Sequence, residues 1–74
     1  MFRYHLMALV EKKSFDDGQR VTINEISEAT GIHRATLSKM INTPGCNVTL
    51  DTIDRLCKFF EVPVEHLIEH VPDK

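Results

Sequence analysis

The sequence predicts an all-α fold, a compact domain of five short helices. Apolar residues recur at three- and four-residue spacing in five separate segments, as on the buried face of a helix. The segments are joined by short stretches with turn chemistry, of which residues 42–45, Asn-Thr-Pro-Gly, are the plainest. A chain of 74 residues is also too short for two separate cores. We therefore expect a single domain over residues 1–74.

The first helix is expected over residues 3–13, because Leu6, Leu9 and Val10 recur at helical spacing. Residues 14–20 are mostly polar and are predicted to form a surface turn.

The second helix is expected to begin at a capping box. In such a box the Thr22 hydroxyl accepts from the amide of Glu25, whose carboxylate reaches back to the amide of Thr22. The helix ends near Thr30, because Gly31 adopts a left-handed turn without a Cβ penalty. Its expected buried set is Ile26, Ala29 and the following Ile32.

The third helix is expected over residues 34–41, with Leu37 and Met40 inward. Thr49 then caps a fourth helix over residues 50–60. The core stripe of the fourth helix is Ile53, Leu56, Cys57 and Phe60.

Pro63 precedes a fifth expected helix over residues 64–69, with Leu67 and Ile68 as its apolar residues. A pairing of residues 1–4 with residues 70–72 as short terminal strands is the alternative for the two ends of the chain.

Composition narrows the function classes. Hydrophobic residues make up 42% and charged residues 27%, which excludes disordered and low-complexity classes. No apolar run approaches the roughly 18 residues of a membrane span, and the N-terminus lacks the form of a signal peptide, so a cytoplasmic protein is expected. His5 and His33 have no partner set for acid–base or nucleophilic chemistry. We expect neither enzyme activity nor a cofactor.

Zinc is the metal that the cysteines and histidines suggest, because His66 and His70 stand four residues apart. Zinc-binding cysteines usually lie two to four residues apart, however, and Cys46 and Cys57 do not. Cys57 also falls on an apolar stripe. We therefore expect two free thiols, with Cys57 in the core, and no metal site.

Charge is segregated along the chain, whose formal net charge is −2. Basic side chains are in excess in residues 1–13 and 31–58, and acidic ones in residues 14–30 and 59–74. An anion-binding face therefore remains available in spite of the net charge.

Residues 22–42 have the pattern of a helix-turn-helix. Two short helices flank a tight turn at Gly31, and Ser27 is small enough for a close approach of the helices. The outer face of the second helix of this motif carries Arg34, Ala35, Ser38 and Lys39. In such a motif the second helix enters the DNA major groove while the first crosses the backbone.

Residues 26–40 and 49–68 resemble the Cro/cI-type helix-turn-helix regulators, also called XRE-like, which include phage repressors. The resemblance covers nearly the whole chain. It implies base-facing positions for Arg34, Ala35, Ser38 and Lys39. It also implies positions near phosphates for Thr22, Ile23, His33, Thr36 and Asn42. The sequence departs from the family at Ile23, where a polar residue is usual, and at Ile41, where an acidic residue is common.

The side-chain chemistry agrees with these positions. The Arg34 fork suits guanine O6 and N7, Lys39 suits a guanine or a phosphate, and the Ala35 methyl suits a thymine methyl.

The partners expected from the resemblance are double-stranded DNA and a second copy of the chain. A palindromic operator is read by a two-fold dimer, so we expect a homodimeric repressor. The expected dimer interface is Phe59, Val62, Val64, Ile68 and Val71, and the alternative is that these residues only cap the core. The alternative function is a protein-interaction module, such as an antitoxin-like partner of a toxin.

Overall fold

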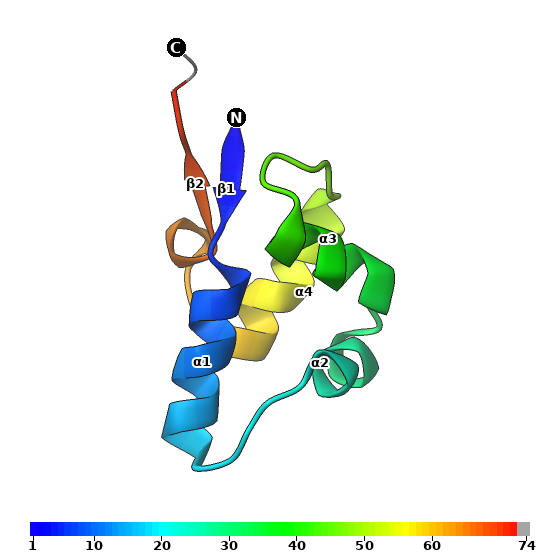
Figure 1. Cartoon of the computed structure of the whole chain (residues 1–74), viewed down its shortest axis with the longest axis vertical. Helices are drawn as coiled ribbons and strands as arrows, with labels where there is room; N and C mark the ends of the chain where they lie inside the picture. Colours follow the sequence, from blue (N-terminus) through cyan, green and yellow to red (C-terminus); the bar gives the residue numbers. More distant parts are fainter. Residues whose placement is uncertain (73–74) are drawn as a thin grey trace.

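The structure, a computed structural model, describes residues 1–72, so Asp73 and Lys74 of the acidic C-terminal segment lie outside it. The described residues form four α-helices, a short 3-10 helix and two short strands (Figure 1). In chain order these are β1 (Phe2–Tyr4), α1 (Leu6–Asp17), α2 (Ile23–Thr30), α3 (Arg34–Asn42), α4 (Leu50–Phe60), the 3-10 helix η1 (Val64–His66) and β2 (Ile68–His70).

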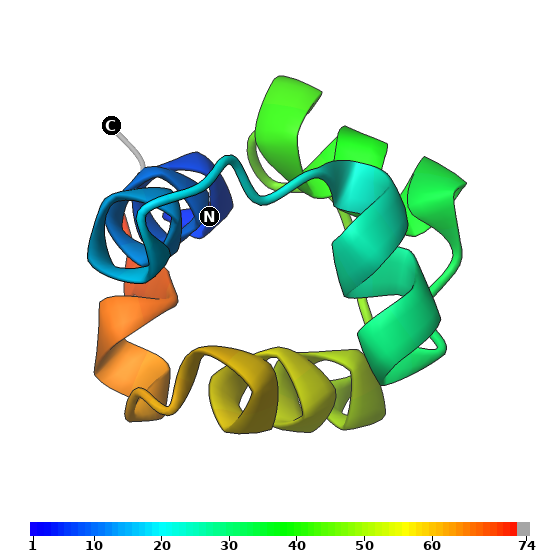
Figure 2. The same ribbon diagram turned by 90° about the horizontal axis from the view of Figure 1, so that it is seen from below.

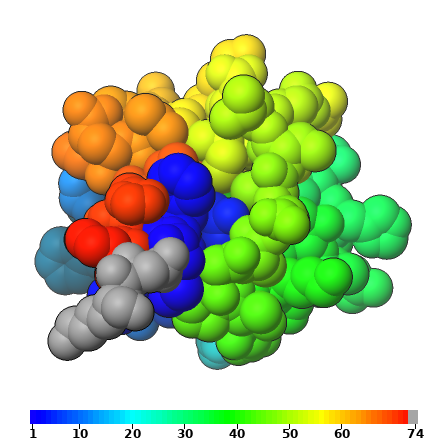
Figure 3. Space-filling view, turned by 90° about the horizontal axis from the view of Figure 1, so that it is seen from above, coloured from blue at the N-terminus to red at the C-terminus, as the bar shows by residue number. Residues whose placement is uncertain are grey.

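The four helices enclose the interior of the molecule, as the view from below shows (Figure 2). β1 and β2 form an antiparallel pair in which Phe2 faces His70 and Tyr4 faces Ile68. This pair projects at one end of the molecule (Figure 1), where β1 lies between β2 and the loop from α3 to α4 (Figure 3).

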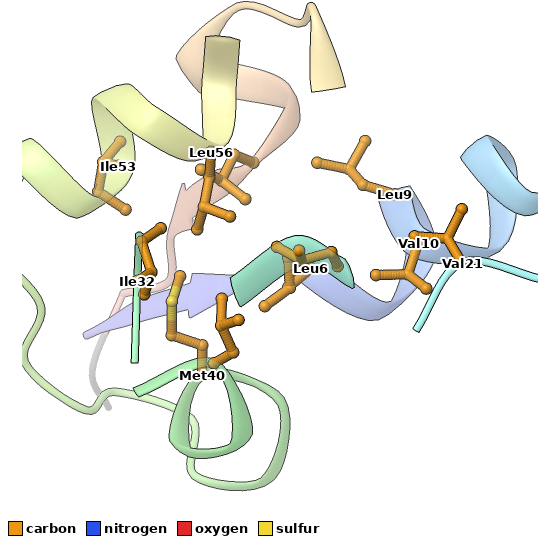
Figure 4. Packing of buried hydrophobic residues seen from close by; sticks show 11 residues of the cluster. Leu6, Leu9, Val10, Val21, Ile32, Met40, Ile53 and Leu56 are labelled. Carbon is orange, nitrogen blue, oxygen red and sulfur yellow. The ribbon is translucent and has the colours of Figure 1, made fainter. Parts of the chain in front are cut away.

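The core draws buried residues from all four helices and from the segments that follow α1, α2 and η1 (Figure 4). Its members are Leu6, Leu9, Val10, Val21, Ile26, Ile32, Leu37, Met40, Ile53, Leu56 and Leu67. Full burial of one such side chain stabilises the fold by about 1.5–3 kcal/mol. The apolar spacing that predicted the helices is therefore the spacing that builds the core.

The helix ends confirm several predictions. The Thr22 hydroxyl accepts from the amide of Glu25 at 3.2 Å, and the Thr49 hydroxyl accepts from the amide of Thr52 at 3.1 Å. Gly31 ends α2 with a left-handed φ of +76°. The expected return bond from the Glu25 carboxylate to Thr22 is not formed within residues 1–72.

The first helix begins and ends later than predicted. Residues 2–4 belong to β1, and the helix extends through residues 14–17, which we predicted as a turn. Ser14 explains the extension, because its hydroxyl donates to the carbonyl of Val10 at 2.8 Å and accepts from the amide of Val21 at 2.8 Å. Asp16 and Asp17 of this last turn are exposed, so their polarity does not oppose helix formation.

The prediction of a fifth helix over residues 64–69 is wrong. Only η1 is helical, and the chain then enters β2. The amide of His5 donates to the carbonyl of Leu67 at 2.7 Å, and the amide of Val71 donates to the carbonyl of Met1 at 2.8 Å. Pairing with the N-terminus thus replaces local helical bonds. The terminal strands that we considered as the alternative are present, with residues 68–70 rather than 70–72 as the second strand.

Three core assignments also change. Ala29, predicted to be buried, is exposed, because the inner face of α2 is turned toward Ile23, Ile26 and Thr30. Cys57 and Phe60 are half-buried and pack against the core from its edge. Among the described helices none is long and apolar enough to cross a lipid bilayer.

Tyr4 ties β1 to the loop after α3, because its hydroxyl donates to the carbonyl of Cys46 at 2.5 Å. We predict that Tyr4→Phe lowers the free energy of unfolding by about 0.5–1.5 kcal/mol, since the half-buried carbonyl loses its partner. Urea unfolding monitored by circular dichroism measures this loss. Phe15→Leu is the control, because Phe15 is 86% exposed and its replacement should stay within about 0.5 kcal/mol. Equal stability of the Tyr4 variant and the wild type would contradict the prediction.

Candidate functional site

The turn between α2 and α3 is closed by hydrogen bonds from its own residues. The amide of Gly31 donates to the carbonyl of Ser27 at 2.8 Å, and the Ser27 hydroxyl donates to the carbonyl of Ile32 at 2.6 Å. The amide of Ile32 donates to the Thr30 hydroxyl at 3.2 Å. Ser27 therefore does more than allow the predicted close approach, because it bonds the far side of the turn.

Arg55 of α4 completes this turn. Its Nη1 donates to the carbonyl of Thr30 at 2.8 Å, and its Nε donates to Asp51 at 2.8 Å. A carbonyl at a helix C-terminus has no intrahelical partner and carries partial negative charge, so a guanidinium suits it. α4 thereby fixes the C-terminus of α2. Sequence reasoning missed this role, since the contact spans 25 residues and Arg55 belongs to a segment, residues 31–58, that was noted only for its basic excess.

α3 presents the predicted polar face to solvent. Arg34, Ala35, Ser38 and Lys39 are all exposed, and Leu37 and Met40 hold the opposite face in the core. At about 100° per residue, these four side chains and the exposed Asn42 fall on one stripe of the helix. Thr36 lies off this stripe and is half-buried.

A shallow groove of about 500 Å³ lies between the start of α2 and the start of α3. It is lined by Ile23, Asn24, His33, Arg34, Ala35 and Ser38. The structure thus brings together five of the nine residues expected near DNA. Of the others, Thr22 stands beside the groove as the cap of α2, while Thr36, Lys39 and Asn42 follow along α3 outside it.

Asn24 is a residue of the groove that sequence reasoning missed. Its Oδ1 accepts a hydrogen bond from Nη1 of Arg34 at 3.2 Å, across the gap between the two helices. Ten residues separate the pair in sequence, and no spacing rule connects them. The only signal was the position of Asn24 in the first turn of the helix that precedes the polar face.

The start of α3 offers backbone donors to the groove. His33 makes no side-chain cap bond, and its carbonyl accepts the amides of Thr36 and Leu37. The amides of the first residues of a helix have no intrahelical acceptor, so those of Arg34 and Ala35 are suited to an anion. The Thr22 hydroxyl accepts from Glu25 and keeps its own proton for a further acceptor.

The electrostatics of the site favour an anion on the α3 side. Arg34 and Lys39 lie on the exposed face of α3, whereas Glu25 and Glu28 are exposed on α2. Glu28 and Arg34 line a common hollow with Asn24 and Ser27, yet within residues 1–72 no ion pair joins the two charged groups, and Arg34 bonds Asn24 instead. The Arg34 guanidinium is therefore not held by its acidic neighbour and stays available to another acceptor.

The cysteines and histidines do not converge on a metal site. His66 lies in η1 and His70 in β2, so they do not share a helix face as their spacing suggested. No group of three His, Cys, Asp or Glu residues able to hold a metal is found in the described part of the chain. Burial, with Asp54 and Glu65 nearby, raises the pKa of the Cys57 thiol, which suits a packed thiol and not a reactive one.

The five residues expected at a dimer interface are placed unequally. Phe59, Val62 and Ile68 are half-buried and pack against the core. Val64 is 48% exposed in η1, and Val71 is half-buried beyond β2. Of these five residues, Val64 therefore has the largest exposed fraction.

Comparison with known proteins agrees with this geometry. A family model described as the Cro/C1-type HTH DNA-binding domain matches residues 17–73, which contain α2, α3, α4 and β2. None of the curated proteins matches the chain.

The Arg55 contact generates a stability prediction at Gly31. A Cβ on Gly31 would lie 2.9 Å from Nη1 of Arg55, so Gly31→Ala should displace the guanidinium from Thr30 as well as strain the backbone. Gly18→Ala is a matched control, since Gly18 has a similar φ of +70° and nothing within 4 Å of the added carbon. We expect Gly31→Ala to cost about 1 kcal/mol more than Gly18→Ala in urea unfolding.

The Arg55→Met background separates the two causes. Without the guanidinium, the costs of Gly31→Ala and Gly18→Ala should become equal, because only the left-handed φ still penalises alanine. An undiminished difference in that background would contradict the role assigned to Arg55.

Proposed function

The chain belongs to the Cro/C1-type helix-turn-helix DNA-binding domain family, and from this premise we propose that it is a transcriptional regulator that recognises a specific duplex sequence. The observation that carries the proposal is the groove in which three of the four predicted reading residues of α3 meet the start of α2. Helix-turn-helix proteins place such a second helix in the major groove.

The proposed reading residues are Arg34, Ala35, Ser38 and Lys39. Arg34 offers a planar fork to guanine O6 and N7, and the Ala35 methyl packs on a thymine methyl. The Ser38 hydroxyl accepts or donates to a base edge, and Lys39 reaches a guanine or a phosphate from the rim of the stripe. Their common exposure on α3 supports these roles.

The proposed phosphate contacts are Thr22, Ile23, His33, Thr36 and Asn42. Ile23 has no polar side chain, so its contribution is the backbone amide at the start of α2, beside the free hydroxyl proton of Thr22. His33 contributes from the start of α3 and Asn42 from its end. Half-buried Thr36 presents the least surface of the five.

We further propose that a cytoplasmic homodimer binds a palindromic operator and represses by occupying it. Two-fold symmetry presents two copies of α3 to two half-sites, which multiplies affinity and doubles the length of sequence read. The proposed contact is formed by exposed Val64 and by the exposed parts of four half-buried residues, Phe59, Val62, Ile68 and Val71.

The alternative is a protein-interaction module, such as an antitoxin-like partner of a toxin. The observation that favours it is the exposure of two large apolar side chains outside the groove, Phe15 and Leu50, which are 86% and 85% exposed. Exposed apolar side chains of this size suit a protein partner better than a phosphate backbone.

Selection from a randomised duplex library at low salt tests the proposal. We expect enrichment of an inverted repeat whose half-sites lie about one helical turn apart. Binding to the enriched duplex should weaken with salt, with a log–log slope of about −0.9 for each phosphate neutralised. Enrichment of no sequence, or binding insensitive to salt, would favour the protein-interaction module.

Substitutions in α3 separate reading from anchoring. We predict that Arg34→Ala relaxes base preference at one operator position, because a bidentate arginine discriminates by about 1–3 kcal/mol. Asn42→Ala should weaken binding to all duplexes about equally, since a phosphate contact carries no sequence information. Competition binding with single-base variants of the enriched duplex measures both effects. Unchanged preference in the Arg34 variant would contradict its assignment as a reading residue.

A further inference from the structure

We propose that Asn24 is a specificity-determining positioning residue, which holds the Arg34 guanidinium over the groove and keeps it from pairing with Glu28. This inference rests on the proposed function, because it concerns how Arg34 reads a base. It gives a side chain of α2 an indirect effect on base recognition, whereas the other proposed contacts of α2 are to phosphates, through Thr22 and the backbone amide of Ile23.

The geometry of Arg34 explains why it needs an external support. Arg34 is the first residue of α3, so its side chain leans toward the turn rather than along the helix. Within residues 1–72, its side chain makes one hydrogen bond, from Nη1 to Oδ1 of Asn24. An arginine side chain that is free in solution loses considerable rotamer entropy when it binds a base. The bond to Asn24 already restricts the Arg34 side chain, so less entropy is left to lose on binding.

The bond to Asn24 leaves the reading chemistry of Arg34 intact. A guanidinium carries five N–H donors, and the bond to Asn24 uses one of them. The remaining donors still suffice for a bidentate contact with guanine. Because the amide of Asn24 is neutral, it positions the guanidinium without cancelling its charge, which a carboxylate at this position would do.

Glu28 is the competing acceptor. It stands one helical turn after Asn24 on α2, and both residues line the same hollow as Arg34. Residues four apart share a helix face, so an arginine released from Asn24 meets a carboxylate farther along that face, away from the groove that Ala35 and Ser38 line. The choice of acceptor therefore decides whether the Arg34 guanidinium points toward the bases or toward Glu28 on α2.

Competition binding against the enriched duplex tests the inference. The readout is the guanine preference, which is the ratio of Kd values for the duplex with another base and with guanine at the position read by Arg34. We expect Asn24→Ala to reduce this ratio about threefold or more, and to leave it unchanged in an Arg34→Ala background, because the two residues act through one contact. The thermal midpoint should stay close to that of the wild type, since the bond is exposed.

Glu28→Gln supplies the decisive variant. In the Asn24→Ala background it should restore most of the guanine preference, because the competing charge is gone. Glu25→Gln is the matched control, since it removes a neighbouring exposed carboxylate of α2 that does not line the hollow. It should change the affinity for both duplexes alike and leave their ratio as it was.

Three outcomes would overturn the inference. If Arg34→Ala abolishes guanine preference while Asn24→Ala leaves it intact, Asn24 plays no positioning role and the proposed function stands. If Glu25→Gln restores preference as well as Glu28→Gln does, the effect is general electrostatics. If the wild type shows no base preference on any duplex, the proposed function fails and this inference fails with it.

Discussion

The left-handed conformation of Gly31 is the constraint on which the candidate site depends. It lets α2 stop and α3 start within three residues, so that the beginnings of both helices border one groove. The same turn leaves the carbonyl of Thr30 without an intrahelical partner, and Arg55 of α4 supplies one. The left-handed conformation of Gly31 thus links the groove to α4, whose Arg55 bonds the turn.

The parts of this fold that the sequence predicts are those with local causes. α2 and α4 have side-chain caps at Thr22 and Thr49, and the spacing of Leu37 and Met40 sets the inner face of α3. The fifth helix was predicted from an apolar pair that suits either a helix or a strand. Hydrogen bonds to residues more than 60 positions away decide for the strand, and no local pattern contains them.

The candidate site also contains residues that local patterns predict and residues that only long-range packing places. The polar stripe of α3 follows from helical periodicity, so Arg34, Ala35, Ser38 and Lys39 could be placed on one face before the structure was known. Asn24 and Arg55 could not, because each acts on another helix through a side chain whose partner is set by packing. The residues proposed to contact DNA are thus easier to predict here than the residues that hold the two helices and Arg34 in place.

α3 is held at its start, at its middle and beyond its end, which limits how far its backbone can adapt to a partner. Leu37 and Met40 anchor its middle in the core, and the Gly31 turn fixes its start. Beyond its end, Tyr4 bonds the loop at Cys46, so the terminal strands also restrain the helix. A helix fixed at these three places presents its stripe with little backbone freedom left to lose on binding. Adaptation to a partner is then confined to side chains, and the long Arg34 has the most to gain from a neighbour that restrains it.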